Sequence, residues 1–373
     1  MASICGSPVC AGGKPKMKFT YTGDYVVRKD GVVELLTSGT IVFLEPKVID
    51  VFMVGGGGGG GSAVRGSGAW GGGGGGYTRT IRRISITKNA PIAVTVGAGA
   101  NSPLNSSAIT DGGSSAFDDL VVAGGKSVSP NTNNNVTSSK GANGGSGGGG
   151  GRYSLSTGGM GGSNGENGEK GSATGGVGQL YPTREFNEAT GKLYAGGGGG
   201  GTYIVANTPV YAPGGSGGGG AGAWCGAKVG SSQAPSAGGA NTGGGGGGGC
   251  ATGFYDTHNG ASGGSGIVCF RDAQELPELA GTWVLHNRIY APENNLNEAI
   301  AFTNTAGTQF SRVTTDANYL RFYTSVGGVN TIYNFASNTW QENYTRYGTM
   351  TFQPGANASD EFRKWLASNA TKQ

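Results

Sequence analysis

The residue types that most often perform catalysis or bind metals are few in this sequence and poorly spaced for either task. It holds two histidines, His258 and His286, and neither stands in a metal-ligand spacing, so each is interpreted as a surface or turn residue. The adjacent carboxylates Asp118 and Asp119 would point to opposite faces of a strand, which disfavours a shared acid–base site. We therefore predict a protein that is not an enzyme.

Two further groupings imitate sites without meeting their requirements. Glu166 and Glu169 lie in a polar loop, where solvated surface is the better interpretation. The segment "LVVAGGKSV" imitates a phosphate-binding loop, but Leu120 stands where the first glycine is needed, so Lys126 and Ser127 indicate a turn. Matches to G-x-G-x-x-G carry no weight among 81 glycines. We expect no cofactor.

The cysteines also argue against a metal site. None of them forms a C-x-x-C pair, and we interpret them as reduced thiols with at most one adventitious pair. The five are Cys5, Cys10, Cys225, Cys250 and Cys269.

Binding has more support than catalysis, because aromatic residues gather in the polar segments between glycine runs. These segments span residues 62–70, 152–160, 179–195, 221–239 and 251–260. They are dominated by Tyr, Trp, Ser, Gly and Asn, as antibody paratopes are, and a rigid scaffold with variable loops is a common recognition design. The predicted receptor-binding residues are Trp70, Tyr181, Phe186, Trp224, Phe254 and Tyr255. The alternative for Trp70 and Trp224, which adjoin glycine runs, is that they cap the scaffold.

Composition excludes several other classes of protein. Only 13% of residues are charged and the net charge is +4, too mild a balance to indicate nucleic-acid or membrane-surface binding. The first residues, "MASICGSPVCAGG", lack the basic and apolar regions of a secretory signal. No apolar run approaches the roughly 18–20 residues of a transmembrane helix, so no membrane insertion is predicted.

Glycine divides the chain into regions. Six of the 81 glycines follow residue 272, and the other 75 precede it. We predict an attachment arm at residues 1–16, a glycine-rich domain at residues 17–272, and a small α+β domain at residues 277–373. Six nearly pure glycine runs lie in the second region: 55–61, 71–76, 147–151, 196–201, 217–220 and 243–249.

These runs could form a flexible tether or a folded core. Flexible linkers usually mix serine with glycine, whereas these runs are nearly pure, recur between strand-like segments and are flanked by large aromatic residues. The folded alternative is a bundle of polyglycine II helices, with three residues per turn and a rise of about 3.1 Å per residue. Such helices make no internal hydrogen bonds, so their backbone groups must pair with neighbouring helices. We favour the bundle.

The remaining segments predict a mainly β fold. Short strands are expected in "KFTYTGDYVVRKDGVVELLTSGTIVFL", with Asp30-Gly31 as a hairpin turn, and in "VIDVFMV", "RTIRRISIT", "PIAVTVGAG", "FDDLVVAGG", "TYIVANTPVYAP" and "SGIVCFRD". In the last region, residues 279–354 alternate as a small sheet. Residues 359–373 indicate one short helix, with Ser359 as N-cap and Phe362, Trp365 and Leu366 on one face.

The order of these motifs resembles a known group. Lys18–Tyr25, Leu35–Pro46 and Ile49–Ser62, together with the closing "GGSGIVCFRD", resemble the glycine-rich domains of bacteriophage and prophage tail proteins. The glycine bundle is similar to the polyglycine sandwich of phage tail-tip adhesins and, more distantly, to the glycine-rich ectodomain of anaplastic lymphoma kinase. Residues 277–373 resemble a C-terminal module of phage tail-associated proteins.

The resemblance implies a structural virion protein of the tail fibre or baseplate, made in the host cytoplasm. Its expected partners are other virion proteins and a glycan or protein of the host surface, and a homotrimer is one expected assembly. The alternatives are a head fibre or capsid decoration protein without receptor contact, a bacterial surface adhesin, and an ice-binding protein. The last would require a regular Thr or Ala array at every third residue, which we do not find.

Overall fold

The computed structural model shows two compact units. The first combines Met1–Arg79 with Ser85–Asp272, and the second combines Thr80–Ile84 with Ala273–Gln373. The division at residue 272 falls where glycine becomes scarce in the sequence. Side chains are described between residues 17 and 274 and at residues 367 and 370–372, and elsewhere only strand backbone is described. The residues outside the description are 1–16, 63–66, 102–109, 130–137, 154–156, 189, 204–209, 227, 229, 253–255, 275–280, 286–295, 305–308, 316–318, 325–328, 335–338, 342–347, 353–366, 368–369 and 373.

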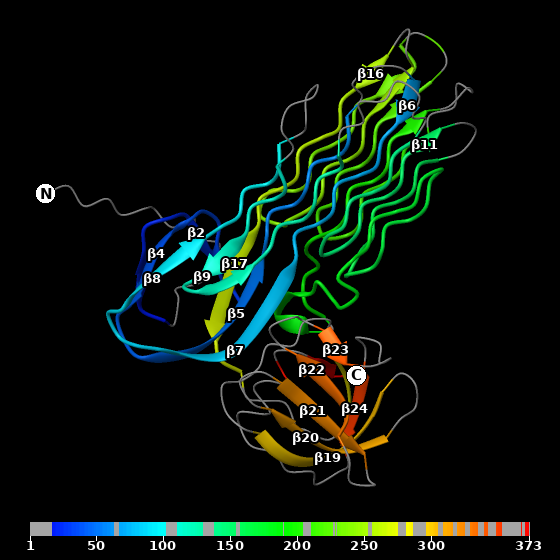
Figure 1. Cartoon of the computed structure of the whole chain (residues 1–373). Helices are drawn as coiled ribbons and strands as arrows, with labels where there is room; N and C mark the ends of the chain where they lie inside the picture. The colour runs from blue at the N-terminus through cyan, green and yellow to red at the C-terminus, as the bar shows by residue number, and fades with distance from the viewer. Residues whose placement is uncertain are drawn as a thin grey trace, which may run out of the picture. The chain divides into compact units, whose positions relative to one another are not determined.

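Two five-stranded sheets form the base of the first unit (Figure 1). One has the order β1-β4-β8-β9-β10, with the strands Phe19–Tyr21, Gly39–Phe43, Pro91–Thr95, Ser115–Phe117 and Leu120–Val122. The other has the order β2-β3-β17-β5-β7, with the strands Tyr25–Val27, Val33–Leu35, Ile267–Asp272, Lys47–Val54 and Thr78–Ile86. The predicted hairpin at Asp30-Gly31 joins β2 to β3, and Gly31 adopts the left-handed φ of +85° that this turn requires.

The base buries a conventional apolar core between its sheets. Phe19 and Phe43 of the first sheet meet Phe270 of the second, each with ring centroids 5.4 Å from it. β5, the strand that enters the first glycine run, is buried from Ile49 to Val54, because both of its faces are covered. The base therefore has the packed core that the glycine runs cannot supply.

The glycine runs form a hydrogen-bonded bundle in which the partner repeats at every third residue. In the run 71–76, the N–H groups of Gly72 and Gly75 donate to the segment at Gly149 and Ser146. The next N–H groups, of Gly73 and Gly76, donate to Gly246 and Gly243, in another segment. A period of three with all hydrogen bonds directed to other segments is the geometry of polyglycine II.

The purest runs occupy the centre of this bundle. Run 71–76 exchanges backbone hydrogen bonds with six surrounding segments: 55–61, 123–126, 142–145, 146–149, 198 and 243–246. The runs 55–61, 147–151, 196–201 and 243–249 are surrounded in the same way, whereas the run 217–220 lies at the periphery. Among the glycines of the five central runs, only Gly243 has a positive φ.

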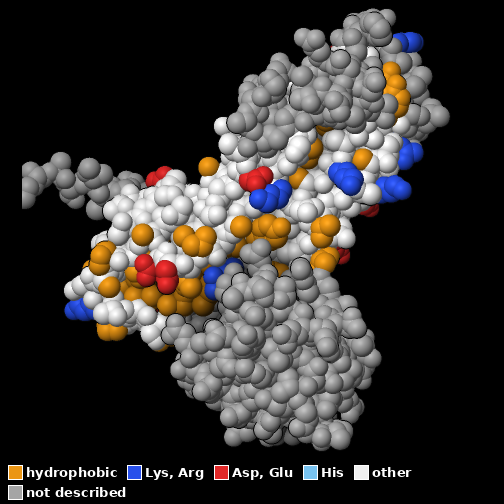
Figure 2. Space-filling model, in the orientation of Figure 1, with side chains coloured by type: hydrophobic (Ala, Val, Ile, Leu, Met, Phe, Trp, Pro, Cys, Tyr) orange, Lys and Arg blue, Asp and Glu red, His pale blue; other side chains and the backbone are white. Residues whose placement is uncertain are grey.

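Close backbone approach explains why these central runs contain only glycine. A Cβ atom built on Gly57 would lie 1.9 Å from the carbonyl oxygen of Gly244, and one on Gly60 would lie 2.0 Å from that of Gly247. Outer segments have a free side and accept a side chain there, as Lys126, Lys140 and Asn143 do. In the described part of the face in Figure 2, white predominates, the colour of backbone and of side chains that are neither hydrophobic nor charged, with hydrophobic and charged side chains scattered over it.

The mainly β fold with a polyglycine II bundle is therefore confirmed, and a flexible tether is excluded for the runs. A tether would leave the glycine N–H groups in water, whereas here they bond to other segments at 2.7–3.1 Å.

The second unit contains one antiparallel sheet of eight strands in the order β23-β22-β21-β20-β19-β24-β18-β25. In that order the strands are Thr339–Gln341, Val329–Asn334, Tyr319–Thr324, Gln309–Thr315, Leu296–Asn304, Gly348–Phe352, Gly281–Leu285 and Ala370–Lys372. Of the predicted C-terminal helix, Ser359, Phe362, Trp365 and Leu366 lie outside the described residues. Its last residues form β25, because Ala370–Lys372 pairs with the edge of β18.

Candidate functional site

Short strands gather at the end of the bundle opposite the base, which we call the tip (Figure 1). Four of them directly follow or closely follow a glycine segment, so the bundle fixes their positions. One tip sheet has the order β11-β12-β13-β14, with strands Arg152–Tyr153, Thr202–Tyr203, Trp224–Cys225 and Ser232–Gln233. The other has the order β16-β15-β6, with strands Thr257–His258, Cys250–Thr252 and Ser67–Ala69.

The tip collects four of the five segments that the sequence marked as binding loops. The segments 62–70, 152–160, 221–239 and 251–260 each contribute at least one of these strands, although they are far apart in the chain. The fifth segment, 179–195, lies near the base instead. Phe254 and Tyr255, two of the predicted binding residues, fall outside the described residues.

Two predicted binding residues at the tip are buried. Trp70 is 2% exposed and packs against Ala251, and Trp224 is 5% exposed. This burial favours the alternative, that the two indoles cap the glycine bundle, over direct receptor contact, which stays an untested prediction. The reason is that a wide apolar ring closes the end of a run better than glycine can. Among the residues that the structure describes, neither indole Nε1 has a hydrogen-bond partner.

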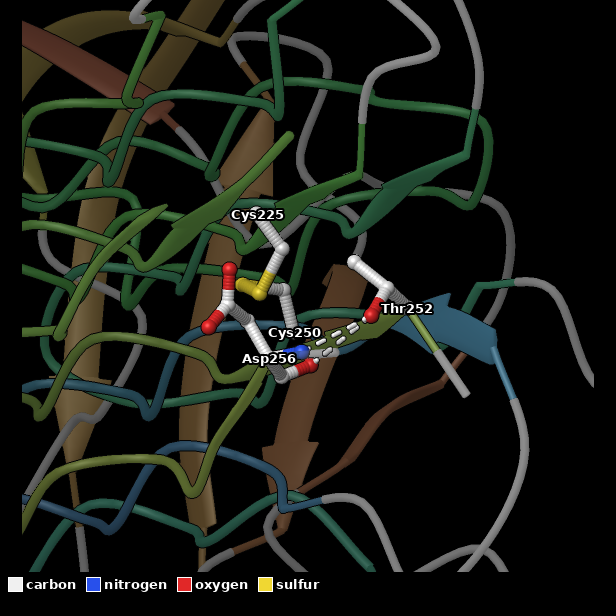
Figure 3. The surroundings of a disulfide bond; sticks show 4 residues. All are labelled: Cys225, Cys250, Thr252 and Asp256. Atoms are coloured by element: carbon white, nitrogen blue, oxygen red, sulfur yellow. Dashed lines mark hydrogen bonds between the residues drawn. A yellow bond between two sulfur atoms is a disulfide. The ribbon is translucent and has the colours of Figure 1, made fainter. Parts of the chain in front are cut away.

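A disulfide between Cys225 and Cys250 joins the two tip sheets (Figure 3). It links β13 to β15 across a sequence separation of 25 residues, and both cysteines are fully buried. The sequence analysis allowed at most one cysteine pair, and this pair forms because the bundle brings two separate glycine segments side by side. The reduced-thiol interpretation holds for Cys269, which is a free and buried thiol.

Two tyrosines that sequence reasoning did not select form an aromatic pair at the tip. Tyr153 and Tyr203 stand in register on the parallel strands β11 and β12, with ring centroids 4.8 Å apart. Both are partly exposed. Burial, and then the neighbouring phenol, raises the pKa of Tyr203, so the Tyr203 ring stays neutral at physiological pH. The missed signal was a repeated spacing, in which each tyrosine follows its glycine run after one intervening residue.

The segment 179–195 lies across the second base sheet and presents little aromatic surface. Phe186 is 1% exposed, and its ring centroid lies 6.0 Å from that of Phe52. Phe186 is a core contact, because the 3-10 turn η1, Glu185–Asn187, directs its side chain toward β5; its burial disfavours the predicted receptor contact, which no observation tests directly. Tyr181 is half-buried, and its hydroxyl donates to the carbonyl of Thr78 at 3.5 Å.

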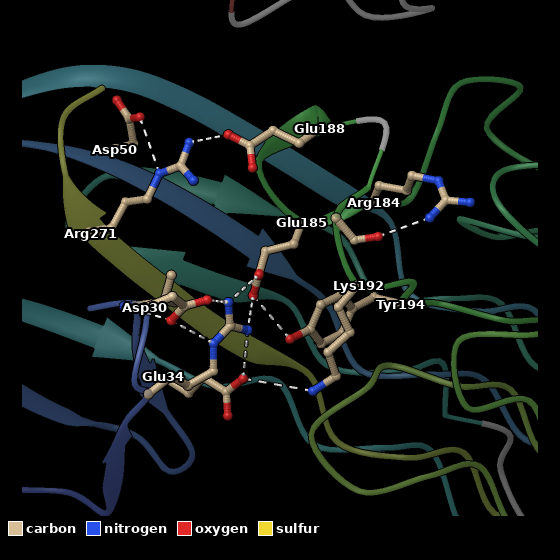
Figure 4. Close-up of polar contacts among 12 residues, drawn as sticks. Asp30, Glu34, Asp50, Arg184, Glu185, Glu188, Lys192, Tyr194 and Arg271 are labelled. Atoms are coloured by element: carbon tan, nitrogen blue, oxygen red, sulfur yellow. Dashed lines mark hydrogen bonds and ion pairs between the residues drawn. The ribbon is translucent and has the colours of Figure 1, made fainter. Parts of the chain in front are cut away.

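Two arginines clamp this segment to the sheet (Figure 4). Arg28 donates to both carboxylate oxygens of Glu185, at 2.9 and 2.7 Å, and also pairs with Asp30 and Glu34. Hydrogen bonding to Arg28 lowers the pKa of Asp30 and keeps that carboxylate ionised. The second arginine, Arg271, pairs with Glu188 and stacks on the Phe186 ring, 4.1 Å from its centroid.

Two side chains packed beside the clamp have raised pKa values. Burial of the Tyr194 phenol raises its pKa, and burial likewise raises the pKa of the Cys269 thiol, so neither group is activated as a nucleophile. Among the described residues, no cluster of three His, Cys, Asp or Glu side chains suits a metal ion. No helix in the described part of the chain has the length and apolarity to cross a membrane.

A family model described as a glycine-rich domain matches residues 37–272, which is more than half of the chain. This protein belongs to the glycine-rich domain family. The matched region begins just before β4 and ends with β17, so the family domain contains the bundle, the tip and most of the base. The match does not extend into the second unit beyond residue 272. No curated protein matches the chain.

Proposed function

We propose that this protein is a non-enzymatic virion protein of a phage tail fibre or baseplate that contacts a glycan or protein of the host surface through its tip. The observation that supports this proposal is the convergence of four sequence segments at one end of a rigid bundle. Met17, which follows the arm at residues 1–16, is buried and leads into β1 at the other end. Attachment and recognition would then occupy opposite ends of the same unit.

Rigidity is what makes the bundle suitable for this role. A binding surface on a flexible tether loses affinity to conformational entropy, whereas strands held by a hydrogen-bonded scaffold are ordered before the partner arrives. The candidate contact residues are Tyr153 and Tyr203, whose paired rings combine apolar area with hydroxyl groups.

Gold labelling of particles tests where the protein is located. An antibody against residues 277–373 is applied to particles purified from the source lysate and viewed by electron microscopy. Label at the fibre tips or baseplate rim is the expected result. Label confined to the capsid would favour a head fibre or decoration protein, and label on cells without labelled particles would contradict a virion role.

Removal of the aromatic pair should weaken receptor contact. Purified wild-type protein is expected to compete with particles for adsorption to host cells, and the Tyr153→Ala/Tyr203→Ala variant should need about tenfold or more protein for the same inhibition. The matched control is Leu44→Ala, which removes an exposed apolar side chain at the base. Equal inhibition by all three proteins would exclude the aromatic pair as the contact.

A further inference from the structure

The tip has a covalent support, whereas the central glycine runs are held by backbone hydrogen bonds. Each strand of the tip has only two or three residues, so each contributes few ladder hydrogen bonds. The Cys225–Cys250 disulfide connects the sheet of β13 with the sheet of β15. It therefore stabilises the arrangement of the two tip sheets relative to each other.

The surroundings of the disulfide decide when it can form. Cys225 and Cys250 are both 0% exposed and pack with Ala223, while the partly buried Tyr203 covers them. Thiol–disulfide exchange requires an attacking thiolate to reach a sulfur atom in line, through a mixed disulfide. Because both cysteines are fully buried, an external disulfide cannot reach them in the closed tip, and oxidation must occur while the tip is open.

We propose that the tip is a redox-timed element: it stays open in the reducing cytoplasm and closes irreversibly after the protein reaches an oxidising medium. Cytosolic thiols are kept reduced, whereas disulfides persist outside the cell. This inference rests on the proposed function only in assigning the change of compartment to release of the particle from the host. The closing of the tip itself depends on the two buried cysteines.

The chemistry needs a small-molecule disulfide, RSSR, as oxidant. The thiolate of one cysteine attacks RSSR, forms a protein–S–S–R bond and releases RS⁻. The second thiolate attacks the protein sulfur of that bond, forms the Cys225–Cys250 bond and releases the second RS⁻. The two protons lost by the cysteines end on two RSH molecules, so two thiols are oxidised and one RSSR is reduced.

Closure also makes the bond resistant to later reduction. Once both sulfur atoms are buried, an external thiolate cannot reach them unless the tip opens first. The disulfide lowers the conformational entropy of the open tip, which makes reopening less favourable. This effect grows with the number of residues between the two cysteines. The oxidised tip is therefore expected to persist in conditions that would reduce an exposed disulfide.

The test follows tip opening by trypsin cleavage after Lys228, an exposed residue three positions beyond Cys225. Full-length protein from cytoplasm, quenched with iodoacetamide in denaturant, should carry alkylated Cys225 and Cys250. After exposure to oxidised glutathione, mass spectrometry should find a linked peptide containing both. Cleavage after Lys228 should then slow by on the order of a hundredfold relative to reduced protein. Cleavage after Lys88, in an exposed turn at the base, should change less than about twofold.

Two variants distinguish the effect of the Cys225–Cys250 disulfide from a general change in stability. Cys225→Ala/Cys250→Ala should cleave like the reduced wild type whether or not the oxidant is present, and Cys269→Ala should keep the full response. A linked peptide in the quenched cytoplasmic sample, or equal cleavage after Lys228 in both redox states, would overturn the proposal. Because no receptor is present in these assays, this result is independent of whether the tip binds one.

Discussion

Replacing Gly72 by alanine is expected to lower the free energy of unfolding by about 3 kcal/mol or more. A Cβ at this position would lie 2.1 Å from the carbonyl oxygen of Gly198 and 2.4 Å from its carbonyl carbon. Both atoms belong to backbone in a neighbouring central run, so no side-chain rotation can relieve the clash. The run itself must shift, and several hydrogen bonds shift with it. Chemical denaturation of the full chain measures the loss.

The matched control is the same substitution at Gly239, on the periphery of the bundle. There a Cβ would meet only the Thr242 side chain, at 3.1 and 3.3 Å, before any backbone atom at 3.5 Å. Alanine also restricts the unfolded chain more than glycine does, which favours folding by a few tenths of a kcal/mol. We expect Gly239→Ala to change the unfolding free energy by less than about 1 kcal/mol. Equal losses in the two variants would show that the central position has no special constraint.

Replacing Arg28, one of the two arginines of the clamp, is expected to have the second large effect on stability. Arg28→Met should cost about 3 kcal/mol, because Glu185, whose side chain is 6% exposed, would remain buried without the guanidinium that binds both of its oxygens. The segment 179–195 should then detach from the sheet more readily, exposing Phe186 and Tyr194. Equilibrium unfolding and hydrogen exchange at that segment measure the two consequences.

A double variant distinguishes the loss of the Arg28–Glu185 attraction from the cost of leaving the Glu185 carboxylate buried without a cation. Arg28→Met/Glu185→Gln should recover a substantial part of the loss, because the buried carboxylate is then neutral. The surface pair Lys126–Asp111, at 2.6 Å but largely in water, provides the control, and Lys126→Met should cost less than about 1 kcal/mol. No recovery in the double variant would mean that Arg28 acts through packing alone.

The bundle could be predicted because close packing of its helices requires glycine, and the sequence shows that requirement as nearly pure glycine runs. A helix surrounded on six sides admits no side chain, so the need for close approach appears directly as pure glycine. Peripheral segments show the same rule in weaker form, since Lys140 and Asn143 stand three residues apart on an open side. The strands of the base were equally visible, because most residues of β5 and β17 are apolar and several are β-branched or aromatic.

The direction in which an aromatic side chain points was not visible in the sequence. Phe186 lies in a polar segment that looks like an exposed loop, yet two ion pairs involving Glu185 and Glu188 fold that segment onto the sheet. Both arginines of those pairs are far from this segment in the sequence, so no local pattern predicts the ion pairs. The Cys225–Cys250 pairing was hidden for the same reason, since it depends on which runs become neighbours.

The period of three has a consequence for how such a gene can change. One added or deleted glycine codon in a central run would rotate every later residue of that helix by about 120°, which moves each hydrogen bond to the wrong neighbour. Three codons restore the rotation and only alter the length. Substitution of a glycine codon in these runs adds a side chain, which the lattice does not accept. We therefore expect variation to concentrate in the loops at the tip, while the glycine scaffold is inherited unchanged.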